Sequence, residues 1–359
     1  MRTTLKISRL CRVLVLMLLA AISGARAQSS FDSVLSGARL EGAIEIWLGS
    51  PSSSHVHRAL LEAFQRRFGL KVHWKWVALH SARATARLMA EASVGRVSAD
   101  IVGGTSDYIA TLSERGLFRP YPWTGVFETA LPGIREPSER SLSELRGLCL
   151  AWFDSVYVIA WNTNFVKASE APRRFSDFLD PKWKGRFALN VLGGAPFDLL
   201  ALELGDADAL KLVRDLLANR PILKSGTPAV GSAITTGEAH LGISSYVTVE
   251  RARRNKEPQE FRFAEDYVPV LPLYICVPEN SPHPNTARLF AAWVVTEGIP
   301  IVERMDASGR ITAPDSSMAK AIVALPATTR LIQERSLADV ARTRAVSSQL
   351  SVLFTGKHE

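Results

Sequence analysis

Short apolar runs and amphipathic segments alternate along the first third of the chain. Residues 43–47 (AIEIW) are an apolar run that predicts a strand, and residues 70–76 alternate between apolar and polar side chains, which also indicates a strand. Residues 55–68 lie between these runs and predict a helix followed by the helix-ending residue Gly69. The apolar face of this helix consists of five residues: Val56, Ala59, Leu60, Ala63 and Phe64.

The same order repeats further along the chain. Residues 82–94 predict a second helix, and residues 99–116 (ADIVGGTSDYIATLSERG) read as a strand, a Gly-Gly loop and a helix. Residues 187–205 and 222–246 repeat the strand, loop and helix. Strands that alternate with helices favour a mostly parallel sheet, so an α/β fold is expected.

The length of the chain favours two lobes, because about 330 residues exceed what one hydrophobic core usually serves. Two apolar strands with no Gly-rich loop after them, near 155–162 and 265–275, are interpreted as hinge strands that cross between the lobes. The first lobe is then expected over 40–156 plus 270–359, and the second lobe over 157–269.

The N-terminus has the three-part pattern of a secretory signal peptide over residues 1–27. A basic segment is followed by an apolar core of about a dozen residues, which is shorter than a membrane span, and then by Ala25 and Ala27 before a cleavage site near Gln28. Removal of this segment, which has five basic residues and no acidic one, lowers the formal net charge from +8 to +3. We therefore expect a periplasmic protein that spans no membrane after cleavage and has no nucleic-acid partner.

Two cysteines remain in the mature chain, Cys149 and Cys276. Their spacing fits no metal motif. They could pair in an exported protein, but two small core residues are the favoured interpretation.

The loops that follow the predicted strands are candidates for a ligand site. Ligands of α/β sheets bind beyond the carboxyl ends of the strands, and helix N-termini there offer unpaired N–H groups to anions. The candidate residues are hydroxyl, glycine and alanine residues of four such loops and two nearby tyrosines: Ser50, Ser52, Ser53, Ser54, Gly104, Thr105, Ser106, Gly194, Ala195, Ser225, Gly226, Thr227, Tyr157 and Tyr246.

Several phrases in this order resemble the periplasmic solute-binding proteins of ABC importers, and above all the branch with ferric-iron and 2-aminoethylphosphonate binders. The most specific are FLDPKWKGR at 178–186 and NSPHPNTARLF at 280–290, with TTGEAHLGIS at 235–244 between them. The resemblance implies a type II periplasmic binding fold: two lobes, each a mostly parallel sheet flanked by helices, that close about hinge strands on a small ligand. It also implies a monomer that delivers this ligand to an ABC permease in the inner membrane.

The iron binders of this branch keep two adjacent tyrosines where this chain has Ser245 and Tyr246. One phenolate is a poor ligand set for ferric iron, which prefers several anionic oxygens. We therefore expect an anion such as a phosphonate, phosphate ester or carboxylate, and no cofactor. Ferric iron, with Tyr246 as a metal ligand, stays the alternative. An amino group on the ligand would require a carboxylate such as Asp107 or Asp198.

The sequence also bears on two other classes of protein, enzymes and sensing subunits. The chain has no nucleophile elbow, HExxH, paired-cysteine zinc pattern or Walker loop, so we expect no enzyme. Some relatives report their ligand to a membrane histidine kinase, and the helix-rich stretch at 335–354 is typical of them. A sensing subunit with a kinase partner is therefore the second alternative.

Overall fold

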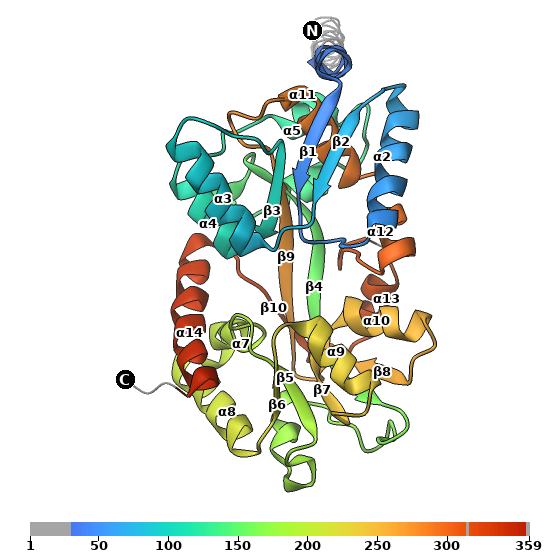
Figure 1. The fold of residues 1–359 in the computed structure, drawn as a ribbon. Coiled ribbons are helices and arrows are strands. Elements are labelled where there is room, and N and C mark those ends of the chain that lie inside the picture. The colour runs from blue at the N-terminus through green and yellow to red at the C-terminus, as the bar shows by residue number, and fades with distance from the viewer. Residues whose placement is uncertain (1–29, 314–315, 357–359) are drawn as a thin grey trace, which may run out of the picture.

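The computed structural model describes residues 30–313 and 316–356. The expected signal peptide lies outside these residues. Two lobes lie one above the other in Figure 1, and two long strands, β4 (Cys149–Asn162) and β9 (Tyr267–Cys276), run between them. The expected fold class, a two-lobed α/β protein of the periplasmic-binding type, is confirmed.

The first lobe is a sheet with helices on both faces. Strand β1 (Ala43–Trp47) lies between β2 (His73–Val77) and β3 (Ile101–Thr105) and is parallel to both, while β9 joins β3 antiparallel. A helix over residues 30–41 precedes β1. The other helices of this lobe are α2 (Ser54–Phe68), α3 (Ser81–Ser93), α4 (Ser106–Glu114), α5 (Trp123–Phe127), α6 (Arg135–Glu139), α11 (Pro284–Val294) and α12 (Ile299–Asp306).

The second lobe repeats this arrangement around the other half of β4. Strand β5 (Phe187–Asn190) is parallel to β6 (Ile222–Lys224) and to β7 (Leu241–Ser245), and β7 is antiparallel to β4. Strand β8 (Gln259–Arg262) also pairs with β4, and β10 (Arg330–Ile332) pairs with β9. Its helices are α7 (Phe197–Leu204), α8 (Asp206–Ala218), α9 (Thr227–Thr235), α10 (Tyr246–Arg254), α13 (Ser317–Val323) and α14 (Leu337–Thr355).

Helix α2 shows why these segments fold as they do. Its apolar residues recur on one face, and Leu60 and Phe64 are fully buried against the first-lobe core. Burial of each such side chain contributes roughly 1.5–3 kcal/mol. The helix ends at Gly69, whose backbone adopts the left-handed conformation with φ 61°.

The two cysteines of the mature chain form a disulfide, Cys149–Cys276. They are direct cross-strand neighbours at the ends of β4 and β9, with Cα atoms 4.5 Å apart, and both are fully buried. The favoured interpretation of two unpaired core residues was therefore wrong. Their proximity follows from the pairing of two strands that are 127 residues apart in sequence.

The C-terminal helix α14 packs on the second lobe. Its side chains Val346 and Leu350 belong to the core cluster of that lobe, and Arg342 donates to Asp206 of α8 and to the Ala201 carbonyl of α7. Figure 1 shows α14 in red beside α7 and α8, with its first turn reaching toward α4. The lobe boundaries expected from sequence, which gave residues 270–359 to the first lobe, stay a prediction.

Candidate functional site

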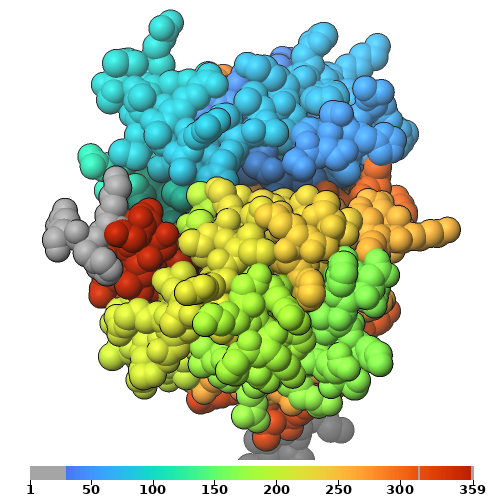
Figure 2. Space-filling model, turned by 60° about the horizontal axis from the view of Figure 1, so that its bottom comes forward, coloured from blue at the N-terminus to red at the C-terminus, as the bar shows by residue number. Residues whose placement is uncertain are grey.

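A cleft of about 1230 Å³ opens between the two lobes. Its first-lobe side is made by loops after β1, β2 and β3, and its second-lobe side by loops after β5 and β6. The middle of β4 and β9 forms its base, and α14 closes one end. In Figure 2 the blue first-lobe surface meets the yellow second-lobe surface, and the red C-terminal helix lies at one end of this boundary. We call this space the interlobe cleft.

Most of the residues predicted from sequence line the interlobe cleft. They are Ser50, Ser52, Gly104, Thr105, Ser106, Tyr157, Gly194, Ala195, Gly226 and Thr227. Four of the predicted residues do not line it: Ser53, Ser54, Ser225 and Tyr246. Ser53 and Ser54 belong to the start of α2, where the chain turns away from the cleft loop, and Ser225 directly precedes the lining residue Gly226.

Tyr246 was expected to contact the ligand, and its position differs from that expectation. It is the first residue of α10 rather than the last of β7, and its side chain packs against Phe261 and Phe263 with 3 % of its surface exposed. Burial raises the pKa of its phenol to about 12. The tyrosine expected to contact the ligand is thus part of the second-lobe core.

Several predicted hydroxyls already have protein partners. The Ser106 hydroxyl donates to the carboxylate of Glu334, and the Thr105 hydroxyl donates to Asp107. The Ser245 hydroxyl donates to Thr227 Oγ1 at 3.3 Å. These contacts fix the loops around the cleft.

Among the described residues, three carboxyl groups line the interlobe cleft. Asp107 lies in the first turn of α4 and Asp198 in the first turn of α7, so they come from opposite lobes. Glu334 lies between β10 and α14, is 6 % exposed, and accepts hydrogen bonds from Ser106 and Thr343. Sequence reasoning considered Asp107 and Asp198 for an amino group and missed Glu334, which no local motif marks.

Burial and mutual repulsion change the titration of these carboxyls. Burial, together with the negative charges of Glu334 and Asp107, raises the pKa of Asp198 to about 8, against the hydrogen bond from the Leu199 N–H. Burial likewise raises the pKa of Glu334, opposed by its two hydroxyl partners. The Tyr157 phenol, also buried, has a raised pKa to which the charge of Asp198 contributes.

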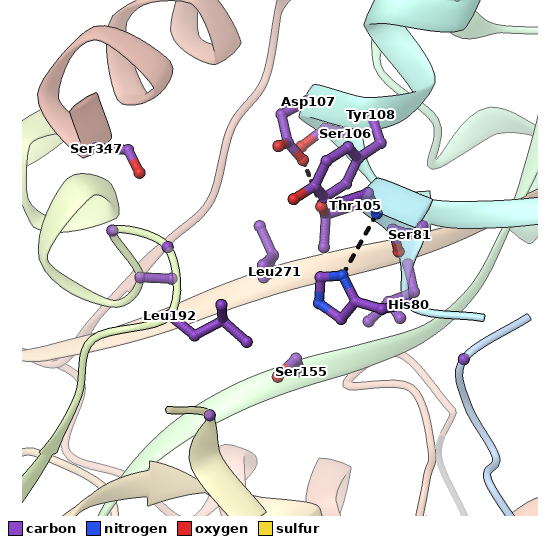
Figure 3. Close-up of a pocket in the computed structure, with 18 of the residues that line it drawn as sticks. His80, Ser81, Thr105, Ser106, Asp107, Tyr108, Ser155, Leu192, Leu271 and Ser347 are labelled. Carbon is purple, nitrogen blue, oxygen red and sulfur yellow. Dashed lines mark hydrogen bonds between the residues drawn. The ribbon is translucent and has the colours of Figure 1, made fainter. Parts of the chain in front are cut away.

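Few basic groups line the described part of the cleft. Arg344 of α14 donates through Nη2 to the Asp107 carbonyl at 2.7 Å and to Thr111 Oγ1 at 3.1 Å. His80, before α3, accepts through Nδ1 from the Ala82 N–H at 3.4 Å. Figure 3 shows His80, Asp107 and Tyr108 from the first lobe on one side of the cleft and Leu192 on the other, with Ser347 of α14 beyond.

A metal centre is not evident in the part of the chain that the structure describes. Within residues 30–313 and 316–356, no group of three or more His, Cys, Asp or Glu residues could hold a metal ion. Within the same ranges, no helix has the length and apolar character needed to cross a bilayer.

Comparison with solved structures shows proteins of the same fold. Iron-bound HitA from Pseudomonas aeruginosa matches 86 % of this chain and 99 % of its own, with a TM-score of 0.66 and 17 % identity. The Trichodesmium protein FutA, in complex with iron and citrate, matches 88 % of this chain and 99 % of its own, with a TM-score of 0.64 and 17 % identity. A structure described as the Atu4243 GABA receptor matches 88 % of this chain and 99 % of its own, with a TM-score of 0.70 and 15 % identity. At these identities the likeness concerns the fold alone.

Sequence comparison identifies the family. A search of curated protein sequences found no match. The family model for the bacterial extracellular solute-binding protein matches residues 59–328, which is most of the chain and includes cleft-lining residues from both lobes. The chain belongs to this family of bacterial extracellular solute-binding proteins.

Proposed function

We propose that the protein captures a small polar solute with an anionic group in the interlobe cleft and delivers it to the permease of an ABC importer. The observation that carries this proposal is that the N-termini of α3, α4, α7 and α9 all border the cleft, two from each lobe. Helix N-termini present unpaired N–H groups and the positive end of the helix dipole, which favour phosphonate, phosphate or carboxylate oxygens.

The course of the chain between the lobes supports a closing motion. Strands β4 and β9 run between the two lobes and form the base of the cleft. A solute that contacts both lobes would stabilise the closed arrangement, because those contacts exist only when the lobes approach. Closure is the signal that a permease can recognise.

Ferric iron is the less favoured ligand. HitA and FutA bind iron according to their descriptions. In this chain the tyrosine at the corresponding sequence position, Tyr246, is buried against Phe261 and Phe263 outside the cleft. A hard cation would therefore lack the phenolate that the iron alternative requires.

A thermal-shift screen of the purified mature protein tests the proposal. The probes are small carboxylates, phosphonates and phosphate esters, with ferric citrate as the iron arm. A true ligand at 100 times its dissociation constant should stabilise the protein by about 2.7 kcal/mol. Replacement of the exposed cleft residue by Ser52→Trp should remove this shift, because the indole would fill space that the ligand needs.

Ser53→Trp is the matched control. Ser53 is the exposed neighbour of Ser52, does not line the cleft, and makes no side-chain capping hydrogen bond to α2. The shift should survive this change. A ligand shift that persists in Ser52→Trp would contradict the proposal, and so would a shift with ferric citrate that citrate alone and the other metal-free probes do not give.

A further inference from the structure

We propose that Arg251 and Arg254 of α10 form an electrostatic latch between the two lobes, which binds the C-terminal end of α12 and holds the lobes in the arrangement that the structure shows. Helix α10 belongs to the second lobe and α12 to the first, and Figure 1 shows them next to each other at one side of the molecule. The inference concerns the arrangement of the lobes, so it does not depend on which solute the cleft binds.

Each of the two helices is anchored in the core of its own lobe. Val302 of α12 is fully buried in the first-lobe core cluster that also contains Leu60 and Phe64. Val249 of α10 is fully buried in the second-lobe cluster that contains Val158 of β4. Because burial of apolar side chains fixes each helix to its lobe, a contact between α10 and α12 is a contact between the lobes.

Arg251 pairs with a buried carboxylate at the end of α12. Its Nη2 lies 2.7 Å from Asp306 Oδ1, and its Nε donates to the Asp306 carbonyl at 3.0 Å. The Asp306 side chain is 5 % exposed, and its other carboxylate oxygen accepts from the Ser308 hydroxyl at 2.6 Å. Separation of the two helices would leave this buried carboxylate without its arginine partner, which is unfavourable.

Arg254 binds the backbone at the same end of α12. The last four carbonyls of a helix lack the intrahelical amide partners of the preceding turns. Nη1 of Arg254 donates to the Glu303 carbonyl at 2.8 Å and to the Arg304 carbonyl at 3.0 Å, while its Nε pairs with Glu250 of its own helix at 3.3 Å. The negative end of the helix dipole also attracts a cation here. The two arginines thus supply both hydrogen bonds and positive charge across the lobe boundary.

Helical spacing separates these two arginines from a third one in the same segment. Arg251 and Arg254 are three residues apart, so they lie on one face of α10. Arg253 instead pairs with Glu250 of its own helix at 2.9 Å and with Glu260 of β8 at 3.2 Å. The ion pairs of Arg253 therefore stay within the second lobe, which makes this residue a matched control for the latch.

Spin-label distance measurements on the purified mature protein without ligand test the latch. One label is placed on each lobe, by Glu114→Cys at the exposed end of α4 and by Arg214→Cys at an exposed position of α8, and neither residue lines the cleft. The two native cysteines are joined in their disulfide and take no label. Arg251→Gln and Arg254→Gln, singly and together, remove the latch contacts, and Arg253→Gln is the control.

One distance should predominate in the wild type. Loss of a charged hydrogen-bonded contact shifts an equilibrium by roughly fivefold, so the population at other distances should rise about fivefold in each single variant and further in the double variant. Helix α14 also contacts both lobes, so we expect a shift in populations rather than free movement of the lobes. Arg253→Gln should keep the wild-type distribution.

The inference is overturned if the double variant has the wild-type distribution of distances, or if Arg253→Gln broadens this distribution as much as the latch variants do. The side chains of Arg251, Arg253 and Arg254 are 37 %, 40 % and 35 % exposed, so their single variants should stay folded. Melting curves of each labelled variant check this.

Discussion

The position of Asp198, which is buried near other carboxyls, lowers the stability of the folded protein when this carboxyl is ionised. Its carboxyl lies in the first turn of α7, near two other carboxyls, where burial and repulsion raise its pKa to about 8. Gly194, four residues earlier, packs closely against this carboxyl: a Cβ built on it would lie 2.6 Å from Asp198 Oδ2. Such unfavourable placement is common at binding sites, where the ligand supplies the missing interaction.

The stability of the ligand-free protein should therefore depend on Asp198 and on pH. A carboxyl whose pKa is higher in the folded than in the unfolded state contributes stability below its unfolded pKa of about 4, and this stability is lost as the pH rises to about 8. The loss is at most about 1.4 kcal/mol per pH unit. Asp198→Asn removes the ionisation, and its side-chain oxygen can still accept from Leu199.

Melting temperatures of wild type and Asp198→Asn between pH 5 and pH 9 measure this effect. The variant should melt higher than wild type, with a difference that grows from pH 5 to pH 8 and then levels off. A constant difference, or one that shrinks as the pH rises, would show that the carboxyl is not the cause.

At the scale of elements, β4 and β9 connect the two lobes and their disulfide lies at one end of the pair. Cys149 and Cys276 are joined where both strands belong to the first lobe, whereas β4 pairs with β7 and β8 beyond Tyr157. The cross-link therefore holds the hinge strands together at one end without joining the moving lobes. Helix α14 contacts α4 of the first lobe through Arg344 and α7 of the second lobe through Arg342. When the lobes close, these contacts of α14 have to adjust.

Loss of the disulfide should lower the free energy of unfolding. Chain-entropy arguments for a loop of 127 residues give about 5 kcal/mol, with less in practice if the unfolded chain retains structure. Urea unfolding of Cys149→Ala/Cys276→Ala should show a lower midpoint than wild type. Reductant should lower the midpoint of the wild type and leave the double variant unchanged. Equal midpoints for wild type with and without reductant, after a thiol assay confirms reduction, would contradict a stabilising role.

At the scale of the whole molecule, the sequence predicts correctly the features that local patterns determine, namely strands, helices and the loops between them. The strand over Ala43–Trp47 and the helix over Thr227–Thr235 agree with the predicted segments, because their apolar periodicity and their Gly, Pro and Ser boundaries are local signals. The loops that line the cleft were also found, since ligand loops follow strands in such folds.

The contacts that escaped prediction join distant parts of the chain. Ser106 and Glu334 are 228 residues apart, and the disulfide spans 127 residues. Such proximity depends on which strands pair and on where α14 docks, and neither is marked by a local motif. The prediction for Tyr246 was wrong for another reason. Strand β7 ends one residue earlier than predicted, at Ser245, so Tyr246 begins α10 and its side chain lies in the core rather than in the cleft.

The disulfide also determines how the molecule should respond to mechanical force. Cys149 is the first residue of β4 and Cys276 the last of β9, so tension applied between the N-terminal helix and α14 passes through the sulfur–sulfur bond and bypasses everything from β4 to β9. In single-molecule pulling, the oxidised chain should extend without them. Reduction should release the segment between the two cysteines, whose sequence separation of 127 corresponds to about 440 Å of contour at roughly 3.5 Å per residue. An oxidised chain that already reaches the full contour would show that the cross-link does not carry the load.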